Sequence, residues 1–235
     1  GSPVTEADMA AHRVLVSGLD ECQPQYPVVS EEGEFEESGS DFPSVHWLVD
    51  PLDGTKEFVK GLPEYTVNVA LVEEGDPVLG VIYIPAADIL YYAAQGLGAW
   101  KVEGAASPKR LNATPEVSAF TAAISRSHAS QEIQDLLERW GVDELVKQGS
   151  SLKICAVAEG KAHVYPRLGP TYHWDTAAGA VVVREAGGEV LDPRGQPLEY
   201  DLRQGWKQYG FFAMCSDLSL ELTPNIAICR RFCKQ

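Results

Sequence analysis

The chain has 235 residues, of which 45% are hydrophobic, and its formal net charge is −15. This length suffices for one large domain or two small ones with a sizeable core, and the chain contains no apolar run of about eighteen residues that would span a membrane. The negative charge argues against binding to nucleic-acid polymers, which requires basic patches.

The cysteines favour a reducing compartment. There are five of them, an odd number, and none is paired in CxxC spacing: Cys22, Cys155, Cys215, Cys229 and Cys233. We therefore expect no zinc site and place the protein in the cytoplasm. The first printed residues show no signal-peptide pattern.

The N-terminal part predicts a helix followed by a short strand. Thr5 is a suitable N-cap, and Asp8 follows three residues later, which is a variant of the capping box. A strand over residues 26–30 then ends at Glu31 and Glu32. A capping role would account for Asp8, and acidic pairs such as Glu31-Glu32 are usually just solvated.

A stretch of twelve residues, WLVDPLDGTKEF over 47–58, organises the chain. The apolar run over residues 45–49 predicts a buried strand, and we expect the chain to leave the sheet at Pro51, which has no N–H for a sheet ladder. Asp50 and Asp53 then lie on one tight loop, an arrangement that favours a hard cation such as Mg²⁺ between their carboxylates.

The same loop also suits a phosphate. Gly54 lets the backbone approach a ligand closely, and the amides of Gly54 and Thr55 are placed to receive a phosphate oxygen. A simple Asx-type turn after a strand is an equally good interpretation of the spacing alone.

The rest of the chain predicts mixed α and β structure. Strands are expected over 66–72, 78–84, 89–94 and 96–102 with antiparallel pairing, a crossover over 103–118, and further strands over 119–125 and 162–167. Helices are expected over 131–140 with Ser130 as cap, up to residue 158 with Ser150 or Ser151 as cap, and from Trp174 to Gly187, with Asp175 as cap.

Three segments carry candidate anion ligands. A polar turn over residues 125–128 includes Ser127 and His128 just before a helix, which suits either an anion or simple capping. Lys153 falls in the first turn of a predicted helix, where its positive charge is repelled by the positive end of the helix dipole. Such a position is unfavourable unless an anion lies nearby, and local conflicts of this kind often mark functional sites. Arg167, at the end of a strand, suits phosphate binding or an ordinary surface position.

The motif D-P-L-D-G-T closely resembles the signature of the magnesium-dependent, lithium-sensitive phosphatases of the inositol monophosphatase superfamily. The following Lys56-Glu57-Phe58 resembles its 3'(2'),5'-bisphosphate nucleotidase branch, and W-D-T-A-A-G over residues 174–179 resembles the second signature of the family. The resemblance extends from about residue 3 to about residue 200.

This resemblance implies a set of site residues. The metal ligands would be Glu31, Asp50, Asp53, Asp175 and the carbonyl of Leu52, together holding two or three Mg²⁺ ions. Thr55 and Asp8 would be the catalytic residues that orient the attacking water. The substrate would be held by Gly54, Thr55, Ser127, His128, Lys153 and Arg167.

The resemblance also implies the reaction and the fold. The expected substrate is a small nucleotide, adenosine 3',5'-bisphosphate, cleaved to AMP without a covalent intermediate, with 3'-phosphoadenosine 5'-phosphosulfate as a second substrate. Bound Mg²⁺ and local cations would reverse the negative field at the site. Two alternatives remain: an inositol or sugar-bisphosphate phosphatase, and a metal- or nucleotide-binding protein without turnover.

The expected fold is α/β, the layered αβαβα sandwich of the inositol monophosphatase and fructose-1,6-bisphosphatase type. We expect an N-terminal half over residues 1–115 and a C-terminal half over 116–235. The family normally has one more long helix before the first helix predicted here, and we expect this additional helix to be missing from the sequence. Peripheral association with the inner membrane is a further family expectation.

Overall fold

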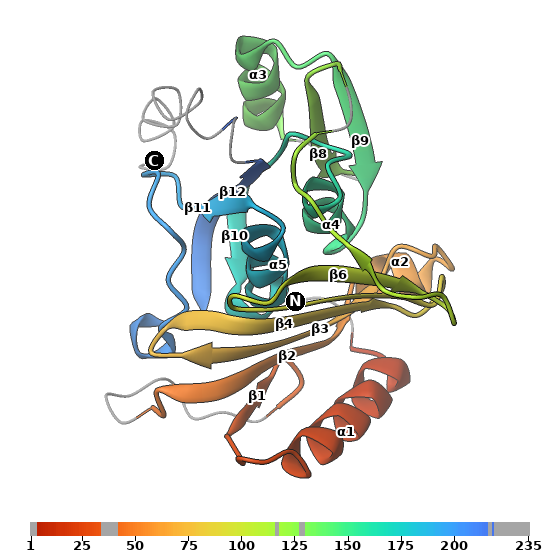
Figure 1. Cartoon of the computed structure of the whole chain (residues 1–235), viewed down its shortest axis with the longest axis vertical. Helices are drawn as coiled ribbons and strands as arrows, with labels where there is room; N and C mark the ends of the chain where they lie inside the picture. The colour runs from red at the N-terminus through yellow and green to blue at the C-terminus, as the bar shows by residue number, and fades with distance from the viewer. Residues whose placement is uncertain (1–3, 34–41, 116–117, 127–129, 216–217, 219–235) are drawn as a thin grey trace.

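The computed structural model describes residues 4–33, 42–115, 118–126, 130–215 and 218. They form two sheets with helices between and outside them (Figure 1). The helices are α1 (Glu6–Asp20), α2 (Thr55–Val59), α3 (Gln131–Trp140), α4 (Leu152–Ala158) and α5 (His173–Glu185), with a short 3₁₀ turn at Leu202–Gln204.

The first sheet has seven strands that lie in chain order. They are β1 (Val28–Ser30), β2 (Val45–Asp53), β3 (Thr66–Glu73), β4 (Asp76–Ile84), β5 (Ile89–Ala94), β6 (Gly98–Glu103) and β7 (Lys109–Arg110). Strands β1 and β2 are parallel, and the later neighbours pair antiparallel, as predicted from the short connections.

The second sheet has five strands in the order β11-β12-β10-β8-β9. They are β8 (Thr121–Ser125), β9 (Glu144–Gln148), β10 (Val164–Tyr172), β11 (Gly188–Leu191) and β12 (Lys207–Cys215). Strand β8 pairs in parallel with β9 and β10, whereas β12 runs antiparallel to β10 and β11. Strands β9, β11 and β12 were not predicted, because their short or partly polar sequences lack a clear period-two pattern.

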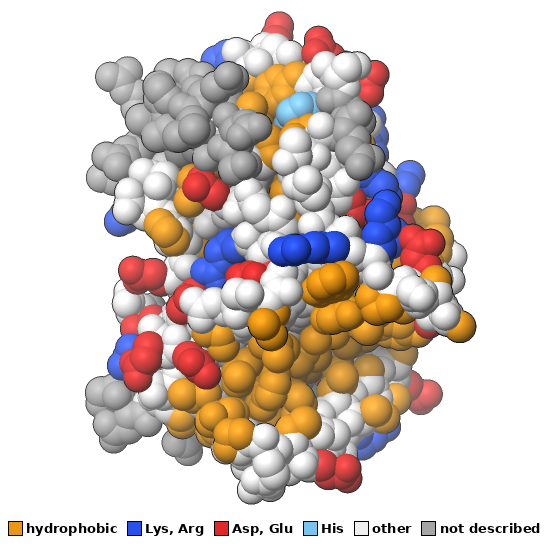
Figure 2. All heavy atoms as spheres, in the orientation of Figure 1, with side chains coloured by type: hydrophobic (Ala, Val, Ile, Leu, Met, Phe, Trp, Pro, Cys, Tyr) orange, Lys and Arg blue, Asp and Glu red, His pale blue; other side chains and the backbone are white. Residues whose placement is uncertain are grey.

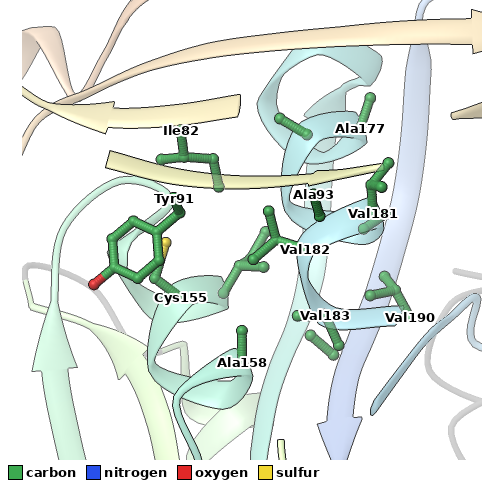
Figure 3. Packing of buried hydrophobic residues seen from close by; sticks show 14 of the residues in the cluster. Ile82, Tyr91, Ala93, Cys155, Ala158, Ala177, Val181, Val182, Val183 and Val190 are labelled. Atoms are coloured by element: carbon green, nitrogen blue, oxygen red, sulfur yellow. The ribbon is translucent and has the colours of Figure 1, made fainter. Parts of the chain in front are cut away.

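Helix α5 lies in the layer between the sheets because most of its residues are small or apolar. Ala177, Val181 and Val182 are buried in one cluster with side chains of both sheets and of α4, and Figure 3 shows them in the core that also contains Ile82 of β4. A Cβ at Gly80 would collide with the carbonyl of Ala178, so glycine allows α5 to pack directly on the sheet.

The outer layers complete the αβαβα sandwich. On one side, α3 packs Ile133, Leu136 and Leu137 against the five-stranded sheet. On the other side, α1 covers β1 and β2 with Leu15 and Leu19. The predicted fold class is confirmed. The division into halves at residue 115 stays a prediction, since one apolar core joins both sheets.

Farther from α1, the outer face of the seven-stranded sheet is apolar. Figure 2 shows hydrophobic side chains gathered on this side of the molecule. A hollow of about 530 Å³ on β4–β6 is lined by Leu79, Val81, Leu90, Tyr92, Ala93, Ala94, Leu97, Gly98 and Trp100.

Within the described residues, no helix is long and apolar enough to cross a membrane.

The prediction that the chain leaves the sheet at Pro51 is wrong. Strand β2 continues to Asp53, and its pairing with β3 shifts register between Asp50, opposite Asn68, and Asp53, opposite Thr66. This bulge lets the strand include a proline without interrupting the regular ladder. It also turns the two aspartates toward the same end of the sheet, where the candidate site lies.

Candidate active site and metal centre

Three carboxylates from separate elements converge beside the end of β2. Glu31 follows β1, Asp50 lies in β2 and Asp175 lies in the first turn of α5. One oxygen from each lies within 4.8 Å of the other two. Asp50 is 1% exposed. Oxygen atoms at this spacing are a suitable set of ligands for a hard divalent cation.

The bulge after Asp50 brings two further predicted ligands to the same cavity. This cavity has a volume of about 500 Å³, and its lining includes Glu31, Asp50, Leu52, Asp53 and Asp175. The amide of Leu52 donates to Oδ1 of Asp50 over 3.0 Å, which fixes the loop. The structure therefore brings all five predicted metal ligands to one cavity, with Asp53 beside the converging trio.

The carboxylates destabilise one another's charged forms. Burial, followed by repulsion from Glu32 and Asp53, raises the pKa of Glu31 to about 7. Burial and the charge of Asp53 raise the pKa of Asp175 to about 8. The pKa of Asp50 is likewise raised, first by burial and then by its acidic neighbours. A divalent cation would remove this repulsion, so the residues fit a metal centre.

Thr55 lines this cavity and contacts the buried Asp8. Thr55 begins α2, and its hydroxyl lies 3.4 Å from Oδ1 of Asp8 and 3.2 Å from the Leu52 carbonyl. Asp8 is 2% exposed. The capping box is present as predicted, since the Thr5 amide donates to Oδ2 of Asp8 over 2.8 Å. Asp8 therefore caps α1 with one oxygen and contacts Thr55 with the other.

Gly54 is required by both conformation and space. Its φ is +92°, in the left-handed region. A Cβ there would lie 2.9 Å from the carbonyl oxygen of Glu64 and 3.3 Å from Cβ of Ser150. Glycine therefore lets the D-P-L-D-G-T segment (residues 50–55, the metal loop) pack against Glu64 and against Ser150, which belongs to the C-terminal half.

Lys153 is a buried cation at the cavity. Burial is the main cause that lowers the pKa of Lys153 to about 8, and the charge of Arg167 contributes. The ammonium donates to the carbonyl of Ser150 over 2.6 Å and lies 5.2 Å from the centre of the Tyr165 ring. An anion in the cavity would offset the cost of keeping this lysine charged.

Arg167 lines the same cavity. Its Nη2 donates to the Pro170 carbonyl over 3.3 Å, whereas its Nε is buried and has no hydrogen-bond partner among the described residues. A buried guanidinium N–H without an acceptor is rare. This donor is available to a ligand in the cavity.

Two predicted substrate residues cannot be placed, because Ser127 and His128 lie outside the described residues. Sequence reasoning also missed contacts in this region. Arg126 pairs with Glu64 through Nε at 2.8 Å, and Glu64 also accepts from the Gly149 amide at 2.9 Å. Nothing local in the sequence indicates these pairings across more than sixty residues.

Two predicted helix caps make other hydrogen bonds in the structure. Ser151 is the N-cap residue of α4, as predicted, but its hydroxyl makes no capping hydrogen bond. The hydroxyls of Ser150 and Ser151 instead donate to the carboxylate of Asp53, at 2.6 and 3.0 Å. Asp175 is the third residue of α5 rather than its N-cap, and its carboxylate accepts from the Tyr172 amide over 2.9 Å. The predicted cap Ser130 of α3 is confirmed.

The chain is similar in sequence to curated bacterial proteins. The 3'(2'),5'-bisphosphate nucleotidase CysQ of Shigella flexneri is 46% identical over 210 residues, which are 89% of this chain and 84% of that protein. CysQ of Haemophilus influenzae is 35% identical over 209 residues, 86% of this chain and 77% of that protein.

Solved structures show the same fold. CysQ from Bacteroides thetaiotaomicron matches with a TM-score of 0.81 and 38% identity, covering 88% of this chain and 83% of that one. The IMPase of Thermotoga maritima matches with a TM-score of 0.75 and 26% identity, covering 96% of this chain and 84% of that one. The model of the inositol monophosphatase family matches residues 1–209. The chain therefore belongs to the inositol monophosphatase family.

Proposed function

We propose that this chain is a metal-dependent 3'(2'),5'-bisphosphate nucleotidase that hydrolyses the 3'-phosphate of adenosine 3',5'-bisphosphate to give AMP and phosphate. The observation that carries the proposal is the composition of one cavity. It is lined by the carboxylate cluster and also by Lys153 and Arg167. A substrate with two phosphates suits such a cavity, because one phosphate would be bound through metal ions and the other by the side chains of Lys153 and Arg167. The 35–46% identity to CysQ nucleotidases supports the same assignment.

The metal would be Mg²⁺, with two or three ions bound. Glu31, Asp50, Asp53 and Asp175 would be ligands through carboxylate oxygens, and Leu52 through its carbonyl. An all-oxygen set favours Mg²⁺ over softer metals. When bound, the ions would neutralise charge on the phosphate and on the attacking and leaving oxygens.

The protein would supply the orientation of the attacking water. The Thr55 hydroxyl, when it donates to Asp8, leaves an oxygen lone pair that accepts a hydrogen bond from a water in the cavity. That water would attack phosphorus while the bond to the 3'-oxygen breaks. No serine or cysteine nucleophile is needed, so the reaction would have no covalent intermediate.

The second phosphate would account for substrate choice. Lys153 and the unpartnered Nε of Arg167 are the described donors that we assign to it, with Ser127 and His128 as further predicted ligands. The amides of Gly54 and Thr55 would contact the phosphate that is cleaved. The sulfated relative, 3'-phosphoadenosine 5'-phosphosulfate, has the same 3'-phosphate and would be a second substrate.

We propose a cytoplasmic location, supported by the odd number of cysteines without CxxC spacing. The partner would be a small nucleotide rather than a nucleic-acid polymer. Although the chain carries a net charge of −15, the cavity itself would bind anions once metal ions join Lys153 and Arg167.

The test compares phosphate release from adenosine 3',5'-bisphosphate, inositol 1-phosphate and fructose 1,6-bisphosphate, each with Mg²⁺ and with a chelator. We expect a higher kcat/KM for the nucleotide and no release with the chelator. Preference for inositol 1-phosphate or the sugar would assign the chain to the other phosphatases of the family. Binding of the nucleotide without release from any substrate would indicate a binding protein without turnover.

A further inference from the structure

We propose that Ser150 and Ser151 are positioning residues for Asp53: their hydroxyls hold Oδ2 of this carboxylate so that Oδ1 is presented to the divalent cation. The inference rests on the proposed function in one respect, namely that Asp53 is a metal ligand. It adds two residues from the other half of the chain, which neither the sequence motifs nor the converging carboxylate trio includes.

The contacts are short and converge on one oxygen. Oγ of Ser150 donates to Oδ2 of Asp53 over 2.6 Å, and Oγ of Ser151 donates to the same atom over 3.0 Å. Ser151 is 3% exposed. Two donors on one carboxylate oxygen fix the rotation of the carboxyl group, because turning it would leave both hydroxyls without this acceptor.

The hydrogen bonds of this network are all donated in the direction of Asp53. Oγ1 of Thr66 lies 2.6 Å from Oγ of Ser150, and Ser150 already gives its one proton to Asp53. Thr66 must therefore be the donor in their contact, although it also lies 3.3 Å from Oδ1 of Asn68. A chain of donors thus runs from β3 through Ser150 to the carboxylate.

The backbone of Ser150 is unusual in a way that suits this role. Its φ is +49°, a left-handed value that residues other than glycine rarely adopt. Its carbonyl accepts the hydrogen bond from the buried Lys153 ammonium over 2.6 Å. Strained conformations persist where several surrounding contacts require them, often at functional sites. Here the strain places the Ser150 hydroxyl on Asp53.

Ser151 connects two candidate ligands. Although it directly precedes α4, its hydroxyl makes no capping hydrogen bond. It contacts Asp53 and also lies 3.4 Å from the backbone carbonyl of Asp175. A serine that favoured the helix alone would cap it. The hydroxyl is therefore directed to the site at the expense of the helix, which is typical of a residue that orients a metal ligand.

The test measures Mg²⁺ binding directly by isothermal titration calorimetry, together with the midpoint of thermal unfolding in a chelator. Partners that orient metal ligands typically contribute about 10–100-fold in metal affinity. We therefore expect Ser151→Ala and Ser150→Gly to raise the Kd for Mg²⁺ by about 10–100-fold. Ser151→Thr retains the hydroxyl and should bind Mg²⁺ nearly as the parent protein does.

Two variants separate positioning from stability. Ser150→Gly removes the hydroxyl but relieves the left-handed backbone, so its unfolding midpoint in chelator should not fall while its Mg²⁺ affinity does. Ser130→Ala is the matched control: it removes the cap of α3, whose hydroxyl accepts from the Ile133 amide over 3.4 Å. This control should lower the unfolding midpoint and leave Mg²⁺ affinity unchanged.

The outcomes are distinct. If the parent protein binds Mg²⁺ and both serine variants bind it within about twofold of the parent value, the positioning role is refuted while the proposed function stands. If Ser151→Thr loses as much affinity as Ser151→Ala, the hydroxyl is not the relevant group and the inference is also refuted. If the parent protein binds no Mg²⁺, the proposed function fails and this inference fails with it.

Discussion

The hydroxyl of Thr55 lies 3.4 Å from Oδ1 of Asp8, a residue 47 positions earlier in the chain. The contact joins the first turn of α1 to the start of α2 at the edge of the metal loop. Asp8 is held in place through its other oxygen, which accepts from the Thr5 amide. The capping of a helix therefore also orients the threonine that we assign to the attacking water.

Removing this hydroxyl should slow the reaction rather than weaken substrate binding. We expect Thr55→Ala to lower kcat by about 10²–10⁴-fold, the usual contribution of one positioned proton-transfer group, with little change in KM. Steady-state kinetics on adenosine 3',5'-bisphosphate measure both constants, and Thr55→Ser is the control that keeps the hydroxyl. An unchanged kcat with a raised KM would assign Thr55 to phosphate binding instead.

Neutralising a buried carboxylate should have opposite effects on activity and stability. Asp50→Asn replaces a fully buried carboxyl group, whose charged form is destabilised by burial and by its acidic neighbours, with an amide that stays neutral and donates to those neighbours. We expect activity with Mg²⁺ to be largely lost and the unfolding temperature in chelator to rise, by about 2–4 °C for each kcal/mol of relieved repulsion. Differential scanning calorimetry in chelator measures the rise. A lower midpoint would contradict the repulsion, and near-normal turnover at limiting Mg²⁺ would contradict the ligand role.

The sequence placed the carboxylates of this cavity together because they lie in contiguous motifs. Asp50, Asp53 and Thr55 belong to one sequence motif, D-P-L-D-G-T, and Asp175 lies at a helix start with a recognisable pattern. The structure brings them together as the motifs imply. The continuation of β2 past Pro51 could not be foreseen, because the bulge depends on the partner strand β3 rather than on the residues of β2 alone.

The serines before α4 show the limit of local reasoning. Ser150 and Ser151 have the sequence pattern of helix caps, and their real acceptor, Asp53, is 97 and 98 residues away in the chain. The same holds for the pairing of Arg126 with Glu64. Side chains that connect the two halves have no periodic signal, so only the folded structure identifies their partners.

The metal-free protein should lose stability as pH rises from about 6.5 to 8. The pKa values of Glu31 and Asp175 are raised to about 7 and about 8 in the folded protein from ordinary values of 4.5 and 3.8. The folded state therefore binds more protons than the unfolded state, and the free energy of unfolding falls with pH until these folded values are passed. Two buried groups have the opposite effect. His173, with a pKa lowered to about 4, acts below its ordinary value of 6.5, and Lys153, with a pKa lowered to about 8, acts as the pH reaches 8 and above.

Mg²⁺ should abolish this decline, because bound cations keep the carboxylates ionised in the folded protein. Urea unfolding between pH 6.5 and 8, with chelator and with saturating Mg²⁺, measures the difference. Asp175→Asn should flatten the decline in chelator, whereas Glu138→Gln, at an exposed position of α3, should leave it unchanged. A metal-free stability that is constant or rises over this interval would show that the carboxylates are not coupled as described.

Lys153 should determine the preference for a substrate with two phosphates. It is 5% exposed and pairs with a carbonyl rather than a carboxylate. A hydrogen bond to a charged group contributes roughly 1.5–3 kcal/mol, so Lys153→Met, which keeps the apolar stem, should lower kcat/KM for adenosine 3',5'-bisphosphate by about one to two decades. Inositol 1-phosphate has no second phosphate and should be nearly unaffected. The ratio of the two kcat/KM values measures the effect, with Lys60→Met, an exposed lysine of the same cavity, as the control. An equal fall for both substrates would mean that Lys153 supports the fold or the metal loop through Ser150, and not the second phosphate.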